Sequence, residues 1–539
     1  MRLFILKAVA VAFILSVMLP AAARAQTKVA KPAEKPEAAK PEPFKPEQVE
    51  THGSVTVSGQ AIDYDAYAGT LVVHPKKPDD DPEEPEPSDD PKAAQPPEAS
   101  MFYVAYFKTG EKAEDRPITF FYNGGPGSSS VWLHMGAFGP RRVDTADHSH
   151  TPPAPYRVVN NQYSLLDVTD LVFVDAPGTG FSRIQGKDAK KAFYSVDGDA
   201  NAFADFITQF LSKYGRWNSA KYLFGESYGT TRSAVLANLL ETDHDIDLNG
   251  VMLLSQILNF DLSPDGPETN PGIDLPYELA LPTYAATAWY HHKLPNAPKN
   301  LQPLLDEVEH FAMAGYAEAL EQGAALPADQ KHAMAEKLHQ YTGLPVAYIL
   351  KANLRIDGGE FEKNLQDSDD LTTGRLDTRF SGPTYDPLSK EAEYDPQSAD
   401  ISAAYVAAFN DYVRKELKYG EGKEYKPEME IKTWNFLHQP PGADQPEQQS
   451  TNVLPDLAQA MKYNPELRVM LNSGYFDLAT PFYEGIYEMN HLALPEKLQK
   501  NIEIKHYQSG HMVYAHLPSL KELHDNVAAF IRQGEQHNP

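Results

Sequence analysis

Six short apolar runs place the strongest limit on the fold of this chain. Each is a few residues long, and helix-patterned stretches such as residues 202–213 lie between them. Buried strands that alternate with helices form a mostly parallel sheet with helices on both faces. The sequence therefore predicts an α/β fold whose strands lie at residues 117–122, 171–176, 221–225, 250–255, 467–472 and 502–507.

Composition excludes several kinds of function. The chain has 539 residues, of which 42% are hydrophobic, so it can bury a large core. Asp and Glu number 75 against 48 Lys and Arg, and the formal net charge is −27. Nucleic-acid binding depends on basic side chains that replace condensed counterions, so this acidic balance argues against a nucleic-acid partner. Because the sequence contains no Cys, disulfides, thiolate nucleophiles and zinc–thiolate sites are excluded.

Residues 1–25 have the pattern of a secretory signal peptide. Arg2 precedes a long apolar run, and small residues follow the run at Ala23 and Ala25. The pattern predicts cleavage before Gln26 and export of the mature chain, to a bacterial periplasm or out of the cell. A membrane anchor at residues 1–25 is the weaker alternative, because the apolar run is short and small residues follow it. The rest of the chain contains no stretch of about 20 apolar residues that could span a bilayer. We therefore expect no stable membrane insertion after cleavage.

Changes in composition divide the rest of the chain. Residues 26–50 are rich in Pro, Lys and Glu, which predicts an extended linker. Two parts of an α/β core follow, at 51–259 and 451–539, and a mainly helical cap at 260–450 separates them. The first part contains an acidic, Pro-rich insertion at 75–100. We interpret this insertion as a solvated loop between two neighbouring strands; the alternative is a docking tail for a basic partner.

A serine flanked by glycines follows one of the predicted strands. The motif GESYG, with Ser227 at its centre, lies directly after the run 221–225 and before a helical stretch. A nucleophilic serine is held on such a sharp strand-to-helix turn, where its hydroxyl is exposed and glycines let the neighbouring backbone approach. The motif alone is common, but in this context it predicts that Ser227 is a catalytic nucleophile.

A second glycine-rich turn follows the strand at 117–122. The motif NGGPG at 123–127 exposes backbone N–H groups in the loop after an early strand, where an oxyanion hole is formed. The second donor would be the N–H of Tyr228, the residue after the predicted nucleophile. Such a turn alone indicates no function, but upstream of Ser227 it predicts stabilisation of a negatively charged oxygen.

A catalytic serine also needs a carboxylate and a histidine, each on a loop after a strand. Asp477 lies just beyond the fifth predicted strand, and His511 lies just beyond the sixth. The chain order Ser227, Asp477, His511 is that of an α/β-hydrolase, and the cap accounts for the long separation of the first two. Asp175 is the competing carboxylate, but it precedes the nucleophile, so we assign it a structural role.

No cofactor and no metal site is predicted. Asp245, Asp247 and Asn249 resemble part of a calcium loop, but the bidentate Glu at its end is missing and its second half is the apolar run 250–255. The turn at 177–183 contains two glycines and lacks the third glycine of a dinucleotide fingerprint.

Three sequence blocks resemble the serine carboxypeptidases, peptidase family S10, and a bacterial-type member in particular. They are NGGPG with the serines that follow it, VDAPGTGFS at the end of a strand, and GESYG, with support from SGYFD and SGHMV. The resemblance implies an α/β-hydrolase fold and removal of C-terminal amino acids from peptides. It also implies roles for single residues: Ser227, Asp477 and His511 as the triad, Gly125 and Tyr228 as oxyanion donors, and Asn123 and Glu226 as ligands of the substrate's C-terminal carboxylate.

The implied role of Glu226 has a consequence for pH dependence. Two ionised carboxylates at hydrogen-bonding distance repel each other, so either Glu226 or the substrate must hold a proton. We therefore expect peptide binding to be favoured at acid pH.

Several positions depart from the family pattern. Ala137 stands where family members usually carry a second acidic residue for carboxylate recognition, and Ser128 stands where a Cys is usual. Tyr514 replaces a common Pro, and Arg232 adds a cation after the serine motif. Ala137 and Arg232 leave the exopeptidase specificity open. Arg232 either binds an anionic end of the substrate or, as we favour, serves in packing or a surface ion pair.

Together these observations predict an exported serine-type carboxypeptidase that acts on peptide substrates through an acyl-enzyme. The sequence leaves open the side chain preferred at the cleaved bond and the oligomeric state. An esterase or acyltransferase on the same fold is the first alternative, since one triad serves both esters and amides. A non-catalytic exported binding protein that uses the acidic insertion is the second.

Overall fold

The computed structural model of the protein describes residues 42–76, 95–429, 433–443, 445–446 and 450–536. The predicted signal peptide at 1–25, most of the linker at 26–50 and most of the acidic insertion at 75–100 lie outside the described residues. The chain from Phe44 onward forms one compact unit. Within the described ranges, none of the helices combines the length and the apolar character needed to cross a bilayer.

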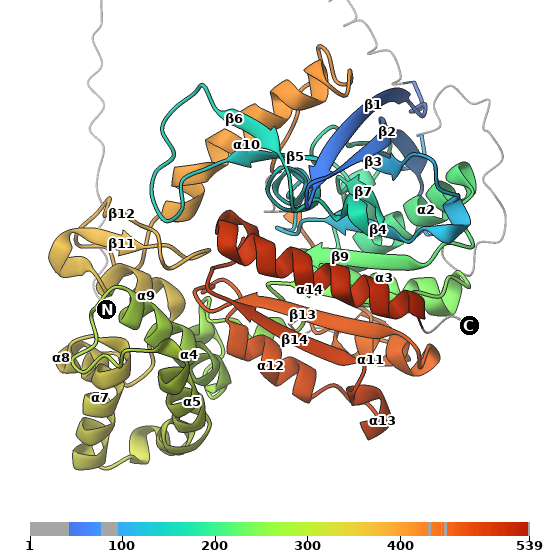
Figure 1. Ribbon diagram of the computed structural model, residues 1–539. Helices are drawn as coiled ribbons and strands as arrows, with labels where there is room; N and C mark the ends of the chain where they lie inside the picture. Colours follow the sequence, from blue (N-terminus) through green and yellow to red (C-terminus); the bar gives the residue numbers. More distant parts are fainter. Residues whose placement is uncertain (1–41, 77–94, 430–432, 444, 447–449, 537–539) are drawn as a thin grey trace, which may run out of the picture. The chain divides into compact units, whose positions relative to one another are not determined.

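A ten-stranded sheet runs through this unit (Figure 1). Its strand order is β1-β2-β3-β7-β4-β9-β10-β13-β14, and a short strand, β8, pairs with β3. Strands β1 to β3 are antiparallel to their neighbours, and every pair from β7 to β14 is parallel. The bounds are β1 Gln48–Val57, β2 Gln60–Val73, β3 Glu98–Lys108, β4 Ile118–Tyr122, β7 Asp170–Val174, β8 Arg183–Gln185, β9 Lys221–Glu226, β10 Gly250–Leu254, β13 Arg468–Gly474 and β14 Ile502–Tyr507. All six predicted strands belong to the parallel part, so the predicted α/β-hydrolase fold is confirmed.

The first strand begins inside the stretch predicted to be a linker. β1 starts at Gln48, and its residues pair with β2 up to the turn at Ser58 and Gly59. Val55 and Val57 near the end of β1 are buried in the core, and the pairing continues outward from them. The boundary at residue 50 is therefore too late, because ordered pairing extends beyond the apolar residues from which a strand is recognised.

Helices cover both faces of the sheet. Alternate side chains of a strand point to opposite faces, so Phe120 belongs to the core formed with α2, α3 and α11, and Phe121 to the core that includes α14. Because both faces are covered, every residue of the central strands β4 and β10 is buried, and most are apolar. The helix bounds are α2 Val196–Tyr214, α3 Tyr228–Asp243, α11 Leu454–Tyr463 and α14 Leu517–Gln536.

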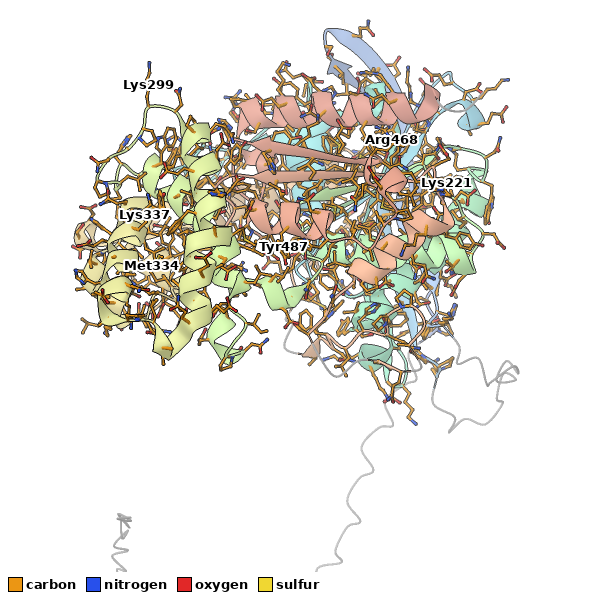
Figure 2. All side chains as sticks on the ribbon, turned by 90° about the horizontal axis from the view of Figure 1, so that it is seen from below. Lys221, Lys299, Met334, Lys337, Arg468 and Tyr487 are labelled. Carbon is orange, nitrogen blue, oxygen red and sulfur yellow. The ribbon has the colours of Figure 1, made fainter. Side chains whose placement is uncertain are left out.

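The region predicted as one helical cap, 260–450, packs in two separate ways. Its first helices form a hydrophobic cluster of their own, together with Phe476 and Leu478 from the loop after β13. In Figure 2, Met334 and Lys337 of this group lie on the opposite side from Arg468, the first residue of β13, so the group lies near the carboxyl end of that strand. The last helix, α10 (Pro396–Lys415), instead buries its apolar side in the core that includes α14. The first group consists of α4 Leu275–Tyr290, α5 Leu301–Phe311, α6 Ala317–Gln322, α7 Ala328–Thr342, α8 Val346–Lys351 and α9 Gly358–Asn364.

The chain returns from α10 to the core through residues 421–453, which we call the return segment. Backbone hydrogen bonds attach it to the loop that follows β4, residues 123–130, which we call the glycine-rich loop. Ser129 N–H donates to the Pro427 carbonyl, and Met429 N–H donates to the Gly127 carbonyl, both at 2.9 Å. Further along, Val453 N–H donates to the Leu258 carbonyl at 2.8 Å. These bonds hold the return segment against the glycine-rich loop.

A buried histidine ties the return segment to two helices. His438 lies 2.6 Å from Asp197 through Nδ1 and 2.9 Å from Asp456 through Nε2, and Asp197 and Asp456 belong to α2 and α11. Burial alone would lower the pKa of His438, but the hydrogen bonds and charges of the two carboxylates outweigh it and raise the pKa to about 9. The imidazolium therefore joins three parts of the chain that are distant in sequence.

We expect this histidine to give the fold a stability that depends on pH. A pKa of about 9 in the folded state, against 6.5 ordinarily, means stabilisation that is fully present below pH 6.5 and lost as pH rises through 9. His438→Gln should lower the free energy of unfolding by about 3 kcal/mol at pH 6 and by much less at pH 10. Urea unfolding at both pH values measures this. The control is His52→Gln, since His52 is 73% exposed in its pair with Asp65, and such a pair contributes about 0–1 kcal/mol. If His438→Gln lowers the free energy of unfolding equally at both pH values, His438 is not the protonated, stabilising group described here.

Candidate active site

Ser227 lies on a strained turn between β9 and α3. Its backbone angles are φ 60° and ψ −130°, in the left-handed half of the map that non-glycine residues seldom adopt. Its N–H donates to the Leu254 carbonyl of the neighbouring strand at 2.9 Å. A Cβ at Gly225 would lie 2.2 Å from the Gly229 carbonyl oxygen, and one at Gly229 would lie 2.9 Å from the Tyr122 carbonyl oxygen. The turn therefore needs glycine on both sides of Ser227.

His511 and Asp477 are brought together on the loops after β14 and β13. His511 Nδ1 lies 2.9 Å from Asp477 Oδ2, and both residues are buried. Thr480 donates to the same carboxylate twice, from its N–H to Oδ1 at 3.0 Å and from its hydroxyl to Oδ2 at 2.8 Å. With Nδ1–H donating to Asp477, Nε2 of the neutral imidazole is left as a proton acceptor.

The electrostatic surroundings of His511 favour its protonated form. Burial alone would lower the pKa of His511, but the charge and hydrogen bond of Asp477 outweigh it and hold the pKa above 6.5. The Ser255 hydroxyl fixes the backbone beside the ring by donating to the His511 carbonyl at 2.7 Å. This pair can accept a proton from a neighbouring hydroxyl and stabilise the resulting cation.

A short segment of the cap region, residues 375–378, holds the loops of both residues. His511 N–H donates to the Leu376 carbonyl at 2.6 Å, and Leu478 N–H donates to the Arg375 carbonyl at 3.1 Å. Thr378 N–H donates in turn to the Phe476 carbonyl at 2.8 Å. Sequence reasoning missed this segment, because it carries no motif and its contacts are made by backbone groups.

One pocket contains the predicted nucleophile and the predicted base. Ser227 and His511 both line a cavity of about 190 Å³, which we call the Ser227 pocket, together with Asn123, Gly125 and Glu226. Within the described part of the chain, the Ser227 hydroxyl makes no hydrogen bond, so it is free to turn toward a substrate or toward His511. Such bonds are often loose before a substrate binds.

The glycine-rich loop packs directly on the first turn of α3. A Cβ at Gly124 would lie 2.3 Å from the Tyr228 nitrogen, so no larger residue fits there. Tyr228 is the first residue of α3, and the first N–H groups of a helix have no partner within it. Gly125 follows at the edge of the same pocket with φ 104°. The loop and the helix thus bring backbone donors toward one place, as an oxyanion hole requires.

Asn123 and Glu226 meet because their strands are paired in register. Tyr122 of β4 lies opposite Gly225 of β9, so the next residues of the two chains are neighbours. Asn123 Nδ2 donates to Glu226 Oε2 at 2.8 Å, and the Asn123 amide is oriented by Leu133 N–H, which donates to its oxygen at 3.2 Å. The predicted carboxylate ligands therefore form one hydrogen-bonded unit.

Tyr514 is the third member of the hydrogen-bonded unit formed by Asn123 and Glu226. The sequence indicated only that Tyr514 stands where the family pattern commonly has a Pro. Its hydroxyl donates to Glu226, 2.8 Å from Oε2 and 3.1 Å from Oε1. Its ring takes the space beside Gly136, where a Cβ would approach it to 2.6 Å. Burial raises the pKa of Glu226 to about 7, although His511, Tyr514 and Asn123 oppose this rise. Glu226 therefore changes charge near neutral pH.

Arg232 and Ala137, which depart from the family pattern, and the competing carboxylate Asp175 do not line the Ser227 pocket. Arg232 is buried behind Asn123, pairs with Asp199 at 2.6 Å and donates to the Asn123 carbonyl at 2.8 Å. Its guanidinium packs over aromatic rings and is not among the residues lining the Ser227 pocket, so its role is packing and a buried ion pair. Ala137 is buried in a π-helical turn at Leu133–Phe138. Asp175 accepts bonds from the Ser130 N–H and hydroxyl, both at 2.8 Å, and braces the glycine-rich loop.

Metal-ligand atoms gather at one exposed place among the described residues. Glu50, His52 and Asp65 on the β1–β2 hairpin bring such atoms within 4.8 Å of one another. His52 Nδ1 and Asp65 form a hydrogen bond of 2.6 Å, which accounts for their closeness without an ion.

If Ser227 is activated by His511, a fluorophosphonate should label it. The labelling rate should rise with pH through a value above 6.5, because the imidazole must be neutral to accept the proton. Asp477→Asn should slow labelling by about 10⁴-fold, since the ring would lose its tautomer and its counter-charge. Asp411→Asn, an exposed acid on α10 paired with Lys415, is the matched control and should label normally. Mass spectrometric mapping of the label to a serine other than Ser227 would refute the assignment.

Comparison with known proteins identifies relatives over part of the chain. Serine carboxypeptidase-like 7 of Arabidopsis thaliana is 26% identical over 185 residues, which is 34% of this chain and 40% of that relative. A carboxypeptidase Y homolog of Arthroderma benhamiae is 34% identical over 130 residues, 24% of each protein. A pheromone-processing carboxypeptidase of Phytophthora infestans is 31% identical over 141 residues, 24% of this chain and 21% of that protein. The matches therefore span 40% or less of the length of these relatives.

Solved structures were found at lower similarity. A proline iminopeptidase of Mycobacterium smegmatis is 11% identical with a TM-score of 0.33, covering 91% of this chain and 100% of that one. A peroxisomal alpha-beta-hydrolase of Saccharomyces cerevisiae is 10% identical with a TM-score of 0.33, covering 86% and 89%.

A family model covers far more of the chain than any of the relatives quoted above. The model described as serine carboxypeptidase matches residues 92–523, which takes in the sheet from β3 to β14, the cap region and all the residues of the Ser227 pocket. The chain therefore belongs to the serine carboxypeptidase family.

Proposed function

We propose that this protein is an exported serine carboxypeptidase that removes the C-terminal residue of peptides. The observation that carries the proposal is the content of one pocket. A serine on a strained turn and a histidine bonded to a buried Asp share that pocket with an Asn–Glu pair able to bind a carboxylate. Membership of the serine carboxypeptidase family supports the same activity.

In the proposed reaction, His511 Nε2 takes the proton of the Ser227 hydroxyl as its oxygen attacks the scissile carbonyl carbon. The N–H groups of Gly125 and Tyr228 stabilise the negative oxygen that forms. The imidazolium, held by Asp477, then gives its proton to the leaving amine, and the C–N bond breaks. Water, deprotonated by the same histidine, attacks the acyl-enzyme, and the proton returns to Ser227.

The Asn123–Glu226 pair supports selection of a free C-terminus. Asn123 donates to Oε2 of Glu226 at 2.8 Å, and the Tyr514 hydroxyl lies closer to Oε2, at 2.8 Å, than to Oε1, at 3.1 Å, so a proton on Glu226 is favoured on Oε1. A protonated Glu226 donates to a substrate carboxylate, whereas an ionised one repels it. Because its pKa is about 7, Glu226 holds this proton at acid pH and loses it as pH rises through 7.

The pattern at residues 1–25 supports export, and the setting we propose is a bacterial periplasm. The substrate is a peptide, and the chemistry assigned above needs no cofactor.

Peptides with a free or an amidated C-terminus test the proposed activity. We expect the wild-type protein to cleave the last bond of the free acid at least tenfold faster, in kcat/KM, than that of the amide, because the amide offers Glu226 no anion. Ser227→Ala should abolish turnover and leave the circular dichroism spectrum unchanged. Equal rates on both peptides would favour the alternative, an esterase or acyltransferase on the same fold.

The pH dependence of KM tests the role of Glu226. For free-acid peptides KM should be flat below pH 7 and rise by up to tenfold per pH unit above it, as Glu226 ionises beside His511, Asn123 and Tyr514. Glu226→Gln should remove this rise because the amide stays neutral. Tyr514→Phe removes a donor to the ionised form and should move the rise to higher pH. A wild-type KM that stays constant from pH 4 to 9 would exclude this role for Glu226.

A further inference from the structure

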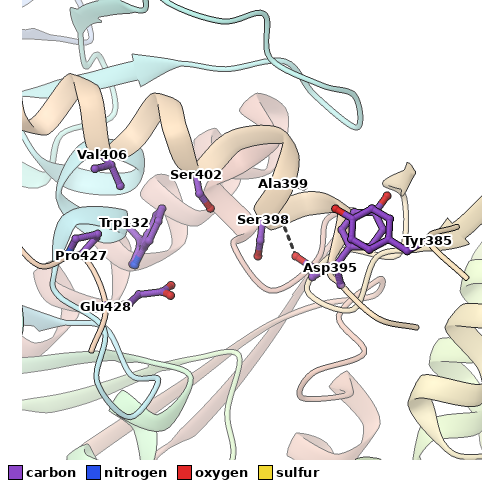
Figure 3. Close-up of a pocket in the computed structure, with 10 residues that line it drawn as sticks. Trp132, Tyr385, Asp395, Ser398, Ala399, Ser402, Val406, Pro427 and Glu428 are labelled. Carbon is purple, nitrogen blue, oxygen red and sulfur yellow. Dashed lines mark hydrogen bonds between the residues drawn. The ribbon is translucent and has the colours of Figure 1, made fainter. Parts of the chain in front are cut away.

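A second pocket opens beside the Ser227 pocket. Its volume is about 440 Å³, and ten residues line it (Figure 3). Two of these residues, Asp395 and Glu428, are acidic, and none is Lys, Arg or His. Trp132 adds an aromatic ring, and Ser398 and Ser402 add hydroxyl groups. Such a lining favours a positively charged ligand over a neutral or negative one.

The two pockets adjoin each other, and we call them together the cleft. Trp132, Ser398, Ser402 and Glu428 line both of them. A peptide bound at Ser227 therefore lies next to the second pocket.

Glu428 is held in place by its backbone. Its neighbours in the return segment are bonded to the glycine-rich loop, Ser129 N–H to the Pro427 carbonyl and Met429 N–H to the Gly127 carbonyl, each at 2.9 Å. Glu428 thus lies opposite Ser128 in an isolated β-bridge. Glu428, one of the four residues that line both pockets, is therefore attached to the loop that carries Gly125.

The carboxylate of Glu428 lacks a partner among the described residues. Asp395, in contrast, accepts three backbone N–H groups, from Arg375 at 2.7 Å, Leu376 at 3.1 Å and Ser398 at 2.6 Å. The last of these bonds is drawn in Figure 3. The side chain of Glu428 is exposed, and the protein atoms around it still desolvate the carboxylate enough to raise its pKa above the ordinary value. A cation beside it would offset this desolvation.

We propose that the second pocket binds an ammonium or guanidinium group of the peptide substrate and that Glu428 selects it. This inference rests on the proposed function. The Ser227 pocket then offers a proton donor for a carboxylate at Asn123 and Glu226, and Glu428, which borders both pockets, offers an anion for a cation. The ring of Trp132 adds an attractive face for the same cation. Two parts of a peptide supply this chemistry, a Lys or Arg side chain and a free N-terminus.

Paired peptides separate these two sources. One set is N-acetylated, has a free C-terminus and carries either Lys or its uncharged isostere norleucine at one of the last three positions. The other set contains norleucine only and has either a free or an acetylated N-terminus. We expect kcat/KM to be about tenfold higher for the cationic member of at least one pair, as one charged hydrogen bond supplies. Raising NaCl from 0.05 to 0.5 M should reduce this preference.

Glu428→Gln assigns the preference to the second pocket. The ratio of kcat/KM for the cationic over the neutral peptide should fall about tenfold, toward 1. Glu424→Gln makes the same change of charge at a 74% exposed residue of the return segment that does not line the pocket, and should keep the wild-type ratio. A wild-type ratio near 1 for every pair, or a ratio that Glu428→Gln leaves unchanged, would overturn the inference.

Binding to the inactive Ser227→Ala protein makes the test independent of turnover. Calorimetry should give about tenfold tighter binding of the cationic peptide, and adding Glu428→Gln should abolish the difference. If the wild-type protein cleaves none of the neutral peptides, the proposed function fails, and these binding data still decide the inference. Equal affinities of both peptides for Ser227→Ala would refute it.

Discussion

The close approach of two backbone turns is the constraint on which the site depends. The loop after β4 lies so near the start of α3 that a Cβ at Gly124 would come within 2.3 Å of the Tyr228 nitrogen. This contact sets exposed N–H groups beside Ser227, and the register of β4 and β9 sets Asn123 beside Glu226. A larger residue at Gly124 or Gly225 would separate the turns. The proposed oxyanion donors and the proposed carboxylate ligands would then move together.

This chain contains no Cys and so no disulfides, and buried charge pairs connect segments that are far apart in its sequence. Arg232 and Asp199 pair at 2.6 Å behind Asn123, and His438 joins α2 and α11 to the return segment. A buried pair is costly to desolvate, but removing one member leaves an uncompensated charge, so each pair fixes the arrangement of the elements that supply it. The Arg232 pair supports the backbone of Asn123 and thereby links the fold to the carboxylate end of the cleft.

Short sequence patterns predict those parts of this protein that are formed by residues close together in the sequence. The strands, the turn at Ser227 and the chain order of the triad candidates follow from runs and motifs only a few residues long, and the fold they predict is the fold observed. The segment at 375–378, Tyr514 and Glu428 were not recognised as parts of the site. Their roles depend on contacts between residues about 100 or more positions apart, through backbone groups or a single hydroxyl, and such contacts leave no repeated pattern in the sequence. For the same reason the sequence predicted that α10 packs with the other cap helices. Apolar periodicity shows that α10 has a buried side, but it does not show which hydrophobic core that side joins.

The cluster formed by α4 to α9 has a consequence for how the protein loses activity. Phe476 and Leu478, on either side of Asp477, are members of that cluster, so the carboxylate is anchored to the cap as well as to the sheet. Proteins open in local cooperative units, often at free energies well below that of global unfolding. Partial opening of the cap would therefore disconnect the acid from the imidazole while the sheet stayed intact. Wherever the cap opens at a lower free energy than the sheet, the contact between Asp477 and His511 is lost while the strands are still paired.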